Sequence, residues 1–241
     1  MYYSRKEDTM SKVLISDFDN TLYVDDNQII QNINKIKDFI NLGNIFIIAT
    51  GRSYIDISKM IIKYNIPYNY LICNDGGTIF DNNGKLLYKK DIPINIANDI
   101  MKYVKTNNLE DITYIDSGYD YTKSIKTEVN AIIIRDIDRL KSLEILKLLE
   151  SNYPEIHGYI SDNWINITEK TVTKANGIKY IQSYLNLDKH DIYTIGDTIN
   201  DIPMIKEYNG VCMINSTDDL KQHCNKHFNS VYEYIDYIEK I

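Results

Sequence analysis

The stretch VLISDFDNTL, residues 13–22, decides the fold that we predict for this chain of 241 residues. It begins with an apolar run, as a buried parallel strand would, and continues into two carboxylates, Asp17 and Asp19. Two carboxylates spaced i, i+2 at a strand end can face one pocket, where one attacks and the other transfers protons. Composition alone would produce an Asp-x-Asp-x-Thr string in about one in ten chains this long and this rich in Asp. The stretch therefore needs support from the rest of the sequence.

Apolar runs and helical patterns alternate on either side of a central segment. Strand, helix, strand, helix, strand is the order of a doubly wound parallel sheet, and it resumes near the C-terminal end. We therefore predict an α/β fold with a doubly wound parallel-sheet core. The strands are residues 13–15, 45–49, 70–73, 192–195 and 211–214, and the helices lie near residues 29–40, 57–61 and 174–185.

The central segment has a different order, in which each helix is followed by two strands. This order predicts an inserted α+β cap with an antiparallel sheet and two helices. We expect a catalytic core of residues 10–82 and 168–241, a cap domain of residues 83–167, and a loosely ordered leader at residues 1–9. The expected cap elements are helices near 94–107 and 139–151 and strands near 112–117, 129–135, 155–160 and 163–168.

Polar clusters of the predicted core follow its strands or open its helices, where ligands bind in an open parallel sheet. Thr50 and Gly51 precede a helix, which is a favourable place for phosphate. Lys174 opens the helix that restarts the core, where an ammonium could offset charge between a carboxylate and a phosphoryl group. Asp197 and Asp201 follow another strand, and with the first loop they offer the oxygen ligands that suit Mg²⁺.

Each of these residues also has a plainer interpretation. The aspartates, the threonine and the lysine can be turn, capping and surface residues. Arg52 is more often an ion-pair partner than a ligand contact. Asn74 and Asp75 follow the third strand and either contact the substrate or shape a turn, and Asn200 either contacts the substrate or stabilises its loop.

Histidine, cysteine and tryptophan residues elsewhere in the chain also have a structural interpretation. His223 and His227 would share one helical face and could bind zinc, but no matching ligand pair stands near them. We therefore interpret that segment as a solvated surface helix. Cys73 and Cys212 lie in apolar runs and are read as core residues. Trp164 alternates with apolar residues along a predicted strand, which indicates packing within the cap.

Four motifs, in this order and context, resemble those of the haloacid dehalogenase (HAD) superfamily over about residues 11–215. They are Asp17-Phe18-Asp19-Asn20-Thr21, Thr50, Lys174 and Gly196-Asp197-x-x-Asn200-Asp201. The loop Asn74-Asp75-Gly76-Gly77, the string Thr50-Gly51-Arg52 and the tail Pro203-Met204 are similar to subclass IIB, the Cof-like phosphatases, whose cap (type C2B) is inserted between the second and third motifs. The family most often has glycine at the position of Asn20, and asparagine tolerates the left-handed backbone of such a loop.

The resemblance implies a Mg²⁺-dependent phosphatase that hydrolyses a small phosphate monoester, such as a sugar phosphate, through an aspartyl-phosphate. Asp17 would be the nucleophile and Asp19 the general acid and base, with Thr50 and Lys174 completing the catalytic set. The metal set would be Asp17, Asp19 through its backbone carbonyl, Asp197 and, through a water molecule, Asp201. The substrate-binding set would be Thr50, Gly51, Asn74, Lys174 and Asn200.

Composition limits the partners and the compartment. A net charge of -7 provides no basic field, so we do not expect nucleic acid as a partner. Three widely spaced cysteines do not form a disulfide framework, which favours a reducing cytoplasm. No apolar run approaches the length of a membrane span, so no membrane partner is expected. The expected partner is a small-molecule phosphate ester, and both its identity and the oligomeric state stay open.

Two rival functions share the fold. A sugar phosphomutase has a similar core and cap, but its cap must clamp a second phosphate with cations. Residues 83–167 contain eleven basic and thirteen acidic residues, a net charge of -2, which favours the phosphatase. A non-catalytic regulatory protein with a HAD-like fold would usually lack one of the acidic or cationic positions, and all of them are present here.

Overall fold

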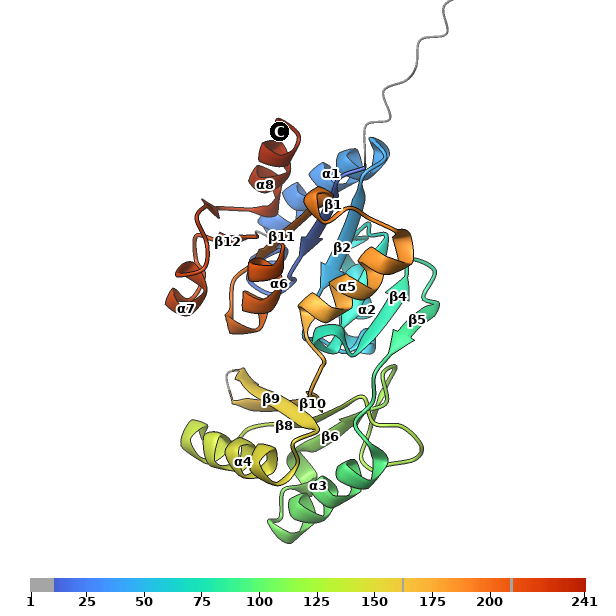
Figure 1. Ribbon diagram of the computed structural model, residues 1–241, viewed down its shortest axis with the longest axis vertical. Coiled ribbons are helices and arrows are strands. Elements are labelled where there is room, and N and C mark those ends of the chain that lie inside the picture. Colours follow the sequence, from blue (N-terminus) through green and yellow to red (C-terminus); the bar gives the residue numbers. More distant parts are fainter. Residues whose placement is uncertain (1–10, 162, 209) are drawn as a thin grey trace, which may run out of the picture.

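The computed structural model describes residues 11–161, 163–208 and 210–241, so the predicted leader at residues 1–9 lies outside the described chain. Two sheets form separate layers, with the larger one in the upper part of Figure 1 and the smaller one below it. Four 3₁₀ turns interrupt the loops at η1 (Asn74–Gly76), η2 (Glu110–Ile112), η3 (Lys189–Asp191) and η4 (Ile199–Asp201). No helix in the described ranges has both the length and the apolar character that a membrane crossing requires.

The larger sheet has eight strands, and the six from β13 to β3 are parallel. Sequence-consecutive strands run outward in both directions from the centre, which confirms the predicted doubly wound core. The order reverses between β1 and β11, and this is where such sheets bind their ligands. In spatial order the strands are β13 (His227–Phe228), β12 (Val211–Met213), β11 (Ile192–Gly196), β1 (Val13–Ser16), β2 (Ile45–Ala49), β3 (Tyr70–Cys73), β4 (Thr78–Asp81) and β5 (Leu86–Lys89).

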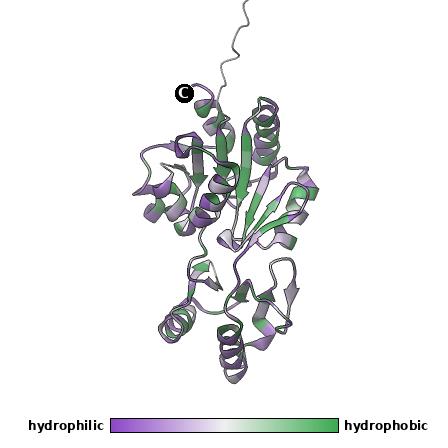
Figure 2. Ribbon diagram, turned by 45° about the vertical axis from the view of Figure 1, so that its right-hand side comes forward, coloured by the Kyte–Doolittle hydropathy of each residue, from purple (hydrophilic) through white to green (hydrophobic). Residues whose placement is uncertain are grey.

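Helices cover both faces of this sheet because successive side chains of each strand point to opposite sides. Leu14 packs in a cluster with helices α1, α2 and α8, whereas its neighbours Val13 and Ile15 pack in a second cluster with α5, α6 and α7. Figure 2 shows the resulting run of hydrophobic residues along the strands. The helices are α1 (Asp26–Asn41), α2 (Tyr54–Tyr64), α5 (Lys174–Leu185), α6 (Ile202–Glu207), α7 (Asp218–Lys221) and α8 (Val231–Ile238).

The smaller sheet is antiparallel throughout, which confirms the predicted α+β insert. Two helices, α3 (Ile94–Thr106) and α4 (Arg139–Asn152), pack against one face of it, and its opposite face looks toward the larger sheet (Figure 1). In spatial order the strands are β7 (Tyr121–Thr122), β6 (Thr113–Asp116), β8 (Ala131–Ile134), β10 (Trp164–Glu169) and β9 (Ile156–Ser161).

The hairpin of β4 and β5 departs from the predicted boundary of the insert. The predicted insert begins at residue 83, but an asparagine followed by a glycine, as at Asn83-Gly84, is also a strong signal for a tight hairpin. Gly84 has a φ of 77° in this turn, and β5 pairs with β4 to extend the larger sheet. The chain passes between the two sheets at residues 90–93 and again at residues 170–173.

The fold tests the predictions for two histidines and two cysteines. The helix expected around His223 and His227 is wrong, because α7 ends at Lys221 and His227 begins strand β13. The two histidines therefore do not share a helical face. Cys73 and Cys212 are fully buried, which confirms them as core residues.

Candidate active site

The carboxyl ends of β1 and β11 bring two aspartates together at the point where the strand order reverses. Asp17 is the first residue after β1, and its backbone N–H donates to the carbonyl of Ile195 in the neighbouring strand at 3.0 Å. Asp197 is the first residue after β11. Both side chains are almost completely buried, so the sheet itself fixes where these carboxylates lie.

Lys174 joins two of the buried carboxylates. Its Nζ lies 2.5 Å from Oδ1 of Asp17 and 2.7 Å from Oδ1 of Asp201, and its side chain is fully buried. Burial opposes the charge of Lys174, but Asp17 and Asp201 outweigh that effect and raise its pKa. A buried ammonium survives only with such partners, so the surface-lysine interpretation is wrong.

Asp201 holds the loop after β11 in place. Its Oδ2 accepts hydrogen bonds from the backbone N–H groups of Asp197 at 2.9 Å and Thr198 at 3.1 Å, while Lys174 binds the other oxygen. A Cβ at Gly196 would lie 2.4 Å from the Cγ of Asp201, so glycine is required for this approach. Asp201 thereby fixes both the Asp197 loop and the Lys174 ammonium.

Three carboxylates in this cluster can hold a metal ion. Asp17, Asp197 and Asp201 each offer an oxygen within 4.8 Å of the others. Burial, reinforced by Asp201, raises the pKa of Asp197 to about 6. Burial likewise raises the pKa of Asp17, against the opposing effect of Lys174. A divalent cation would relieve this crowding of negative charge, and an all-oxygen donor set suits a hard ion such as Mg²⁺.

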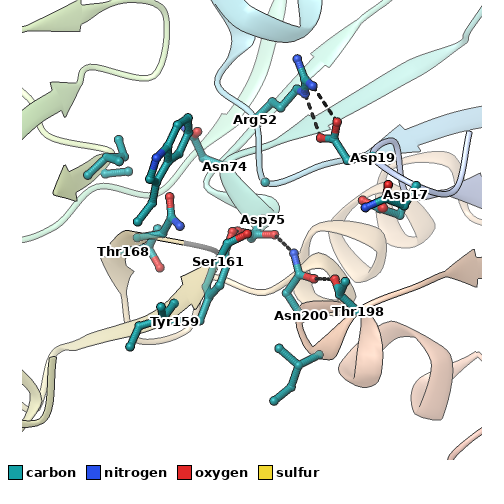
Figure 3. Close-up of a pocket in the computed structure, with 18 of the residues that line it drawn as sticks. Asp17, Asp19, Arg52, Asn74, Asp75, Tyr159, Ser161, Thr168, Thr198 and Asn200 are labelled. Carbon is teal, nitrogen blue, oxygen red and sulfur yellow. Dashed lines mark hydrogen bonds and ion pairs between the residues drawn. The ribbon is translucent and has the colours of Figure 1, made fainter. Parts of the chain in front are cut away.

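The side chain of Asp19 lies outside that group of three. Arg52 donates to both of its oxygens, from Nε at 2.8 Å and from Nη2 at 2.6 Å, and the guanidinium lies 5.2 Å from the ring centre of Phe18. Figure 3 shows the Asp19 carboxylate pointing toward Arg52. The interpretation of Arg52 as an ion-pair partner is confirmed.

Thr50 and Gly51 precede Arg52 in the loop after β2. Thr50 is buried, and its hydroxyl oxygen accepts a hydrogen bond from the backbone N–H of Arg52 at 3.1 Å, as in a capped turn. Gly51 lines the cavity, and a Cβ there would lie 2.6 Å from the hydroxyl oxygen of Tyr159. A tyrosine of the smaller sheet thus reaches the loop that we predict to bind phosphate.

The loop after β3 connects the two sheets. Asn74 and Asp75 have left-handed backbones, with φ of 47° and 53°. The buried amide of Asn74 donates to Oδ2 of Asp116 at 3.1 Å and to Oδ1 of Asn130 at 2.7 Å, and both partners belong to the insert. Its hydrogen bonds therefore shape the connection between the sheets, while the predicted substrate contact stays a prediction.

Asp75 bridges the two sheets at the cavity. Its carboxylate accepts from the hydroxyl of Tyr159 at 2.6 Å and from Nδ2 of Asn200 at 2.9 Å. Asn200 in turn accepts from the Thr198 hydroxyl at 2.5 Å (Figure 3). Loop stabilisation therefore accounts for the Asn200 amide, and its predicted role in substrate binding also stays a prediction.

A cavity of about 1080 Å³ opens above the cluster, between the two sheets. The sequence reading missed Tyr159 and Tyr121 in its wall, although the alternation along each strand could have indicated their faces. Trp164 packs against Arg135 of the insert, as the predicted cap packing implies, but it is not part of the buried core of the insert. Its side chain is 41% exposed and lines the cavity.

Comparison with known proteins places this site in a family. The model of the haloacid dehalogenase-like hydrolases matches residues 14–134 and 115–234. The chain belongs to this family. The match confirms the predicted superfamily and makes the protein a hydrolase.

Relatives and solved structures of the family resemble the chain along nearly its whole length. A 5-amino-6-(5-phospho-D-ribitylamino)uracil phosphatase of Bacillus subtilis is 24% identical, over 90% of both chains. A haloacid dehalogenase-like hydrolase from Bacteroides thetaiotaomicron has a TM-score of 0.82 at 18% identity, over 95% of this chain and 99% of that one. A sugar phosphatase of HAD subclass IIB has a TM-score of 0.78 at 17% identity, covering 96% and 100%. These structures share the HAD fold with this chain.

One position where this HAD hydrolase departs from the common family pattern is accommodated locally. Asn20 adopts a left-handed backbone with a φ of 56°, as predicted for an asparagine in place of glycine. Its N–H donates to the carbonyl of Tyr23 at 2.9 Å, which closes the turn. The substitution leaves Asp17 and Thr21 in place, and the Thr21 hydroxyl donates to Asp197 at 3.1 Å.

Proposed function

We propose that this HAD hydrolase is a Mg²⁺-dependent phosphatase acting on small phosphate monoesters through an aspartyl-phosphate on Asp17. The observation that carries this proposal is the buried cluster of Asp17, Lys174, Asp197 and Asp201 beneath a large cavity. Such a site holds one carboxylate in place as a nucleophile and offers positive charge beside it.

The side chains divide the work between them. Asp17 attacks phosphorus in line with the leaving oxygen, and Lys174 neutralises charge between this carboxylate and the phosphoryl group. A bound Mg²⁺ would supply the positive charge that lets an anionic nucleophile approach a phosphate dianion. Asp17 and Asp197 would hold the ion by side-chain oxygens and Asp19 by its backbone carbonyl, with Asp201 positioning a water ligand.

Asp19 acts as the proton donor to the leaving alkoxide and then as the base for the hydrolytic water. In the described structure both its oxygens bind Arg52. We propose that this pair opens when substrate enters, because phosphoryl oxygens can take the place of the carboxylate on the guanidinium fork.

The leaving group would lie in the cavity between the core and the insert, which we treat as a cap domain that sets specificity; the pairing of β5 with β4 favours a beginning after Lys89 over the predicted beginning at residue 83. A volume of about 1080 Å³ is ample for a sugar-sized leaving group. The relatives that act on a ribityl phosphate and on sugar phosphates support this substrate class. Thr50, Gly51 and Asn200 line or support the phosphoryl end of the cavity.

The test is phosphate release by the purified protein with Mg²⁺ across a panel of sugar phosphates and other monoesters. The Asp17→Asn variant, with the same shape and no nucleophile, is the matched control. Release by wild type and not by the variant supports the phosphatase. Conversion of one sugar phosphate to its isomer without release would support a phosphomutase, and equal inactivity of both proteins would support a non-catalytic role.

A further inference from the structure

The inner face of the smaller sheet carries an arginine. Along β8 the side chains of Ile132 and Ile134 pack with the helices, while Ala131 and Ile133 line the cavity. Arg135 follows at the next position of that alternation and also lines the cavity. Trp164 in β10 obeys the same rule, since its neighbour Ile165 packs with the helices.

Three aromatic rings surround the guanidinium of Arg135. Its Cζ lies 4.2 Å from the ring centre of Trp164, 4.5 Å from that of Tyr114 and 5.5 Å from that of Tyr121. Aromatic faces hold the plane of a guanidinium and leave its N–H edges free to donate. Among the described residues, Nε of Arg135 is buried without a hydrogen-bond partner, and no carboxylate forms an ion pair with the group.

Arg52 is a useful contrast on the opposite side of the same cavity. It also lies over an aromatic ring, but Asp19 occupies its fork with two hydrogen bonds. Arg135 has the aromatic support, and no carboxylate of the described ranges pairs with it. Because a guanidinium keeps its charge at every pH of interest, the two Nη groups of Arg135, rather than its buried Nε, are available to an external anion.

The charges lining the cavity are divided between its two sides. The described residues of the insert contribute Arg135 and Arg139 and no carboxylate to the wall. The larger sheet, its loops and its helices contribute one cation, Arg52, which Asp19 already pairs, and six carboxylates: Asp17, Asp19, Asp56, Asp75, Asp197 and Asp219. The net charge of -2 over residues 83–167 therefore hides a positive inner face.

We propose that Arg135, held by Trp164 and Tyr114, binds a second anionic group on the leaving group, either a carboxylate or a phosphate. The proposal rests on the proposed phosphatase function and specifies its substrate class as phosphate monoesters with a remote anion. With the reacting phosphoryl group at Asp17, the second anion would lie on the side of the insert, where Arg135 lines the cavity. The Arg135 fork then acts as a specificity determinant far from the reacting phosphorus.

Matched pairs of esters test this subsite and separate the two kinds of anion. The carboxylate pair is 6-phosphogluconate and glucitol 6-phosphate, and the phosphate pair is fructose 1,6-bisphosphate and fructose 6-phosphate. We expect wild type to favour the member with the second anionic group in at least one pair by about tenfold in kcat/KM. Arg135→Gln should bring that ratio close to one, while kcat/KM for p-nitrophenyl phosphate stays within about twofold. Arg135→Lys keeps the charge without the fork and should give an intermediate ratio.

Lys147→Gln is the matched control, because it removes the same charge from an exposed position of α4 outside the cavity wall. It should keep the wild-type ratio. A wild-type ratio near one for both pairs, or an unchanged ratio in Arg135→Gln, would overturn the proposal. Calorimetric binding of the same esters to Asp17→Asn reads the subsite without turnover. Absence of hydrolysis by wild type would refute the phosphatase function. Equal binding of both members of each pair to Asp17→Asn would refute the subsite.

Discussion

The two sheets of this protein hold a positive charge in opposite ways. In the parallel sheet, Lys174 is fully buried and paired with Asp17 and Asp201, so its charge is neutralised within the protein. On the antiparallel sheet, Arg135 is held by aromatic rings and keeps its charge for something outside the protein. The difference indicates a core that performs one fixed reaction and an insert that selects what reacts.

The largest expected effect concerns the nucleophile, which the proposed reaction of the core requires. Asp17→Asn keeps the shape and part of the hydrogen bonding of the cluster but cannot attack phosphorus. We expect kcat/KM to fall by more than about 1000-fold, equivalent to about 4 kcal/mol of transition-state stabilisation, for every ester tested. Steady-state kinetics would measure this, and circular dichroism would check the fold. Activity within about tenfold of wild type would refute the role of Asp17.

Metal dependence should sharpen the division of roles within the core. Chelation with excess EDTA should abolish turnover, and added Mg²⁺ should restore it. In Mg²⁺ titrations, Asp197→Ala should raise the half-saturating concentration more than Asp201→Asn, since we place Asp197 as a direct ligand. Asp201→Asn should instead lower the melting temperature, because Lys174 is left with a single carboxylate partner. Full turnover in EDTA, or the reverse order of the two variants, would contradict this assignment.

The core was predictable from the sequence because its chemistry lies next to its strands. Asp17 and Asp197 each follow a buried apolar run by one position, and the sheet geometry brings adjacent strand ends together. The left-handed backbone of Asn20 was predictable for the same local reason. The pairing of Asp19 with Arg52 was only one of two readings, since a sequence does not say which partner a guanidinium will find.

The insert was predictable in class but not in function. Its helices and strands follow the expected order, yet the Asn83-Gly84 turn was read as a boundary and not as a core hairpin. The packing predicted for Trp164 rests on the alternation of side chains along its strand. Alternation separates the two faces of a strand, but it does not say which face the rest of the protein covers. Arg135 can be assigned to the cavity face only from the pairing of β8 with β10 and from the packing of α3 and α4 on the other face of the sheet.

A pH-dependent prediction addresses the junction of the two sheets. Asp116 is fully buried, and burial raises its pKa to about 6, opposed by hydrogen bonds from Gly118 and Asn74. The folded state therefore holds a proton that the unfolded state loses near pH 4, so this group destabilises the fold as pH rises from about 4 to 6. Asp116→Asn removes that titration, and we expect its stability relative to wild type to increase with pH by on the order of 2 kcal/mol.

Urea unfolding of both proteins between pH 4 and pH 7.5 measures this difference. Asp120→Asn is the matched control, since Asp120 is an exposed aspartate of the same segment. It should show no comparable trend. A stability difference between Asp116→Asn and wild type that stays constant, or that falls as pH rises, would show that Asp116 is not held in an unfavourable ionised state.

The smallest expected effect tests the contact through which the insert reaches the core. The Tyr159 hydroxyl donates to Asp75 at 2.6 Å, and Asp75 also accepts from Asn200, so one carboxylate joins both sheets above Gly51. Tyr159→Phe removes a hydrogen bond to a charged group, worth about 1.5–3 kcal/mol, without changing the packing of the ring. If this bond holds the insert over the cavity, KM for a sugar phosphate should rise several-fold while kcat for p-nitrophenyl phosphate changes little, because a small activated ester needs less enclosure. Tyr121→Phe is the matched control, since it removes a similar bond from the insert to the core, from the Tyr121 hydroxyl to Asp56 of α2 at 2.8 Å. An equal rise in KM in both variants would mean that several contacts along the interface hold the insert over the cavity. A fall in kcat for both esters in Tyr159→Phe alone would instead place the Tyr159 hydroxyl in the chemical step. That result would contradict the division between a core that reacts and an insert that selects.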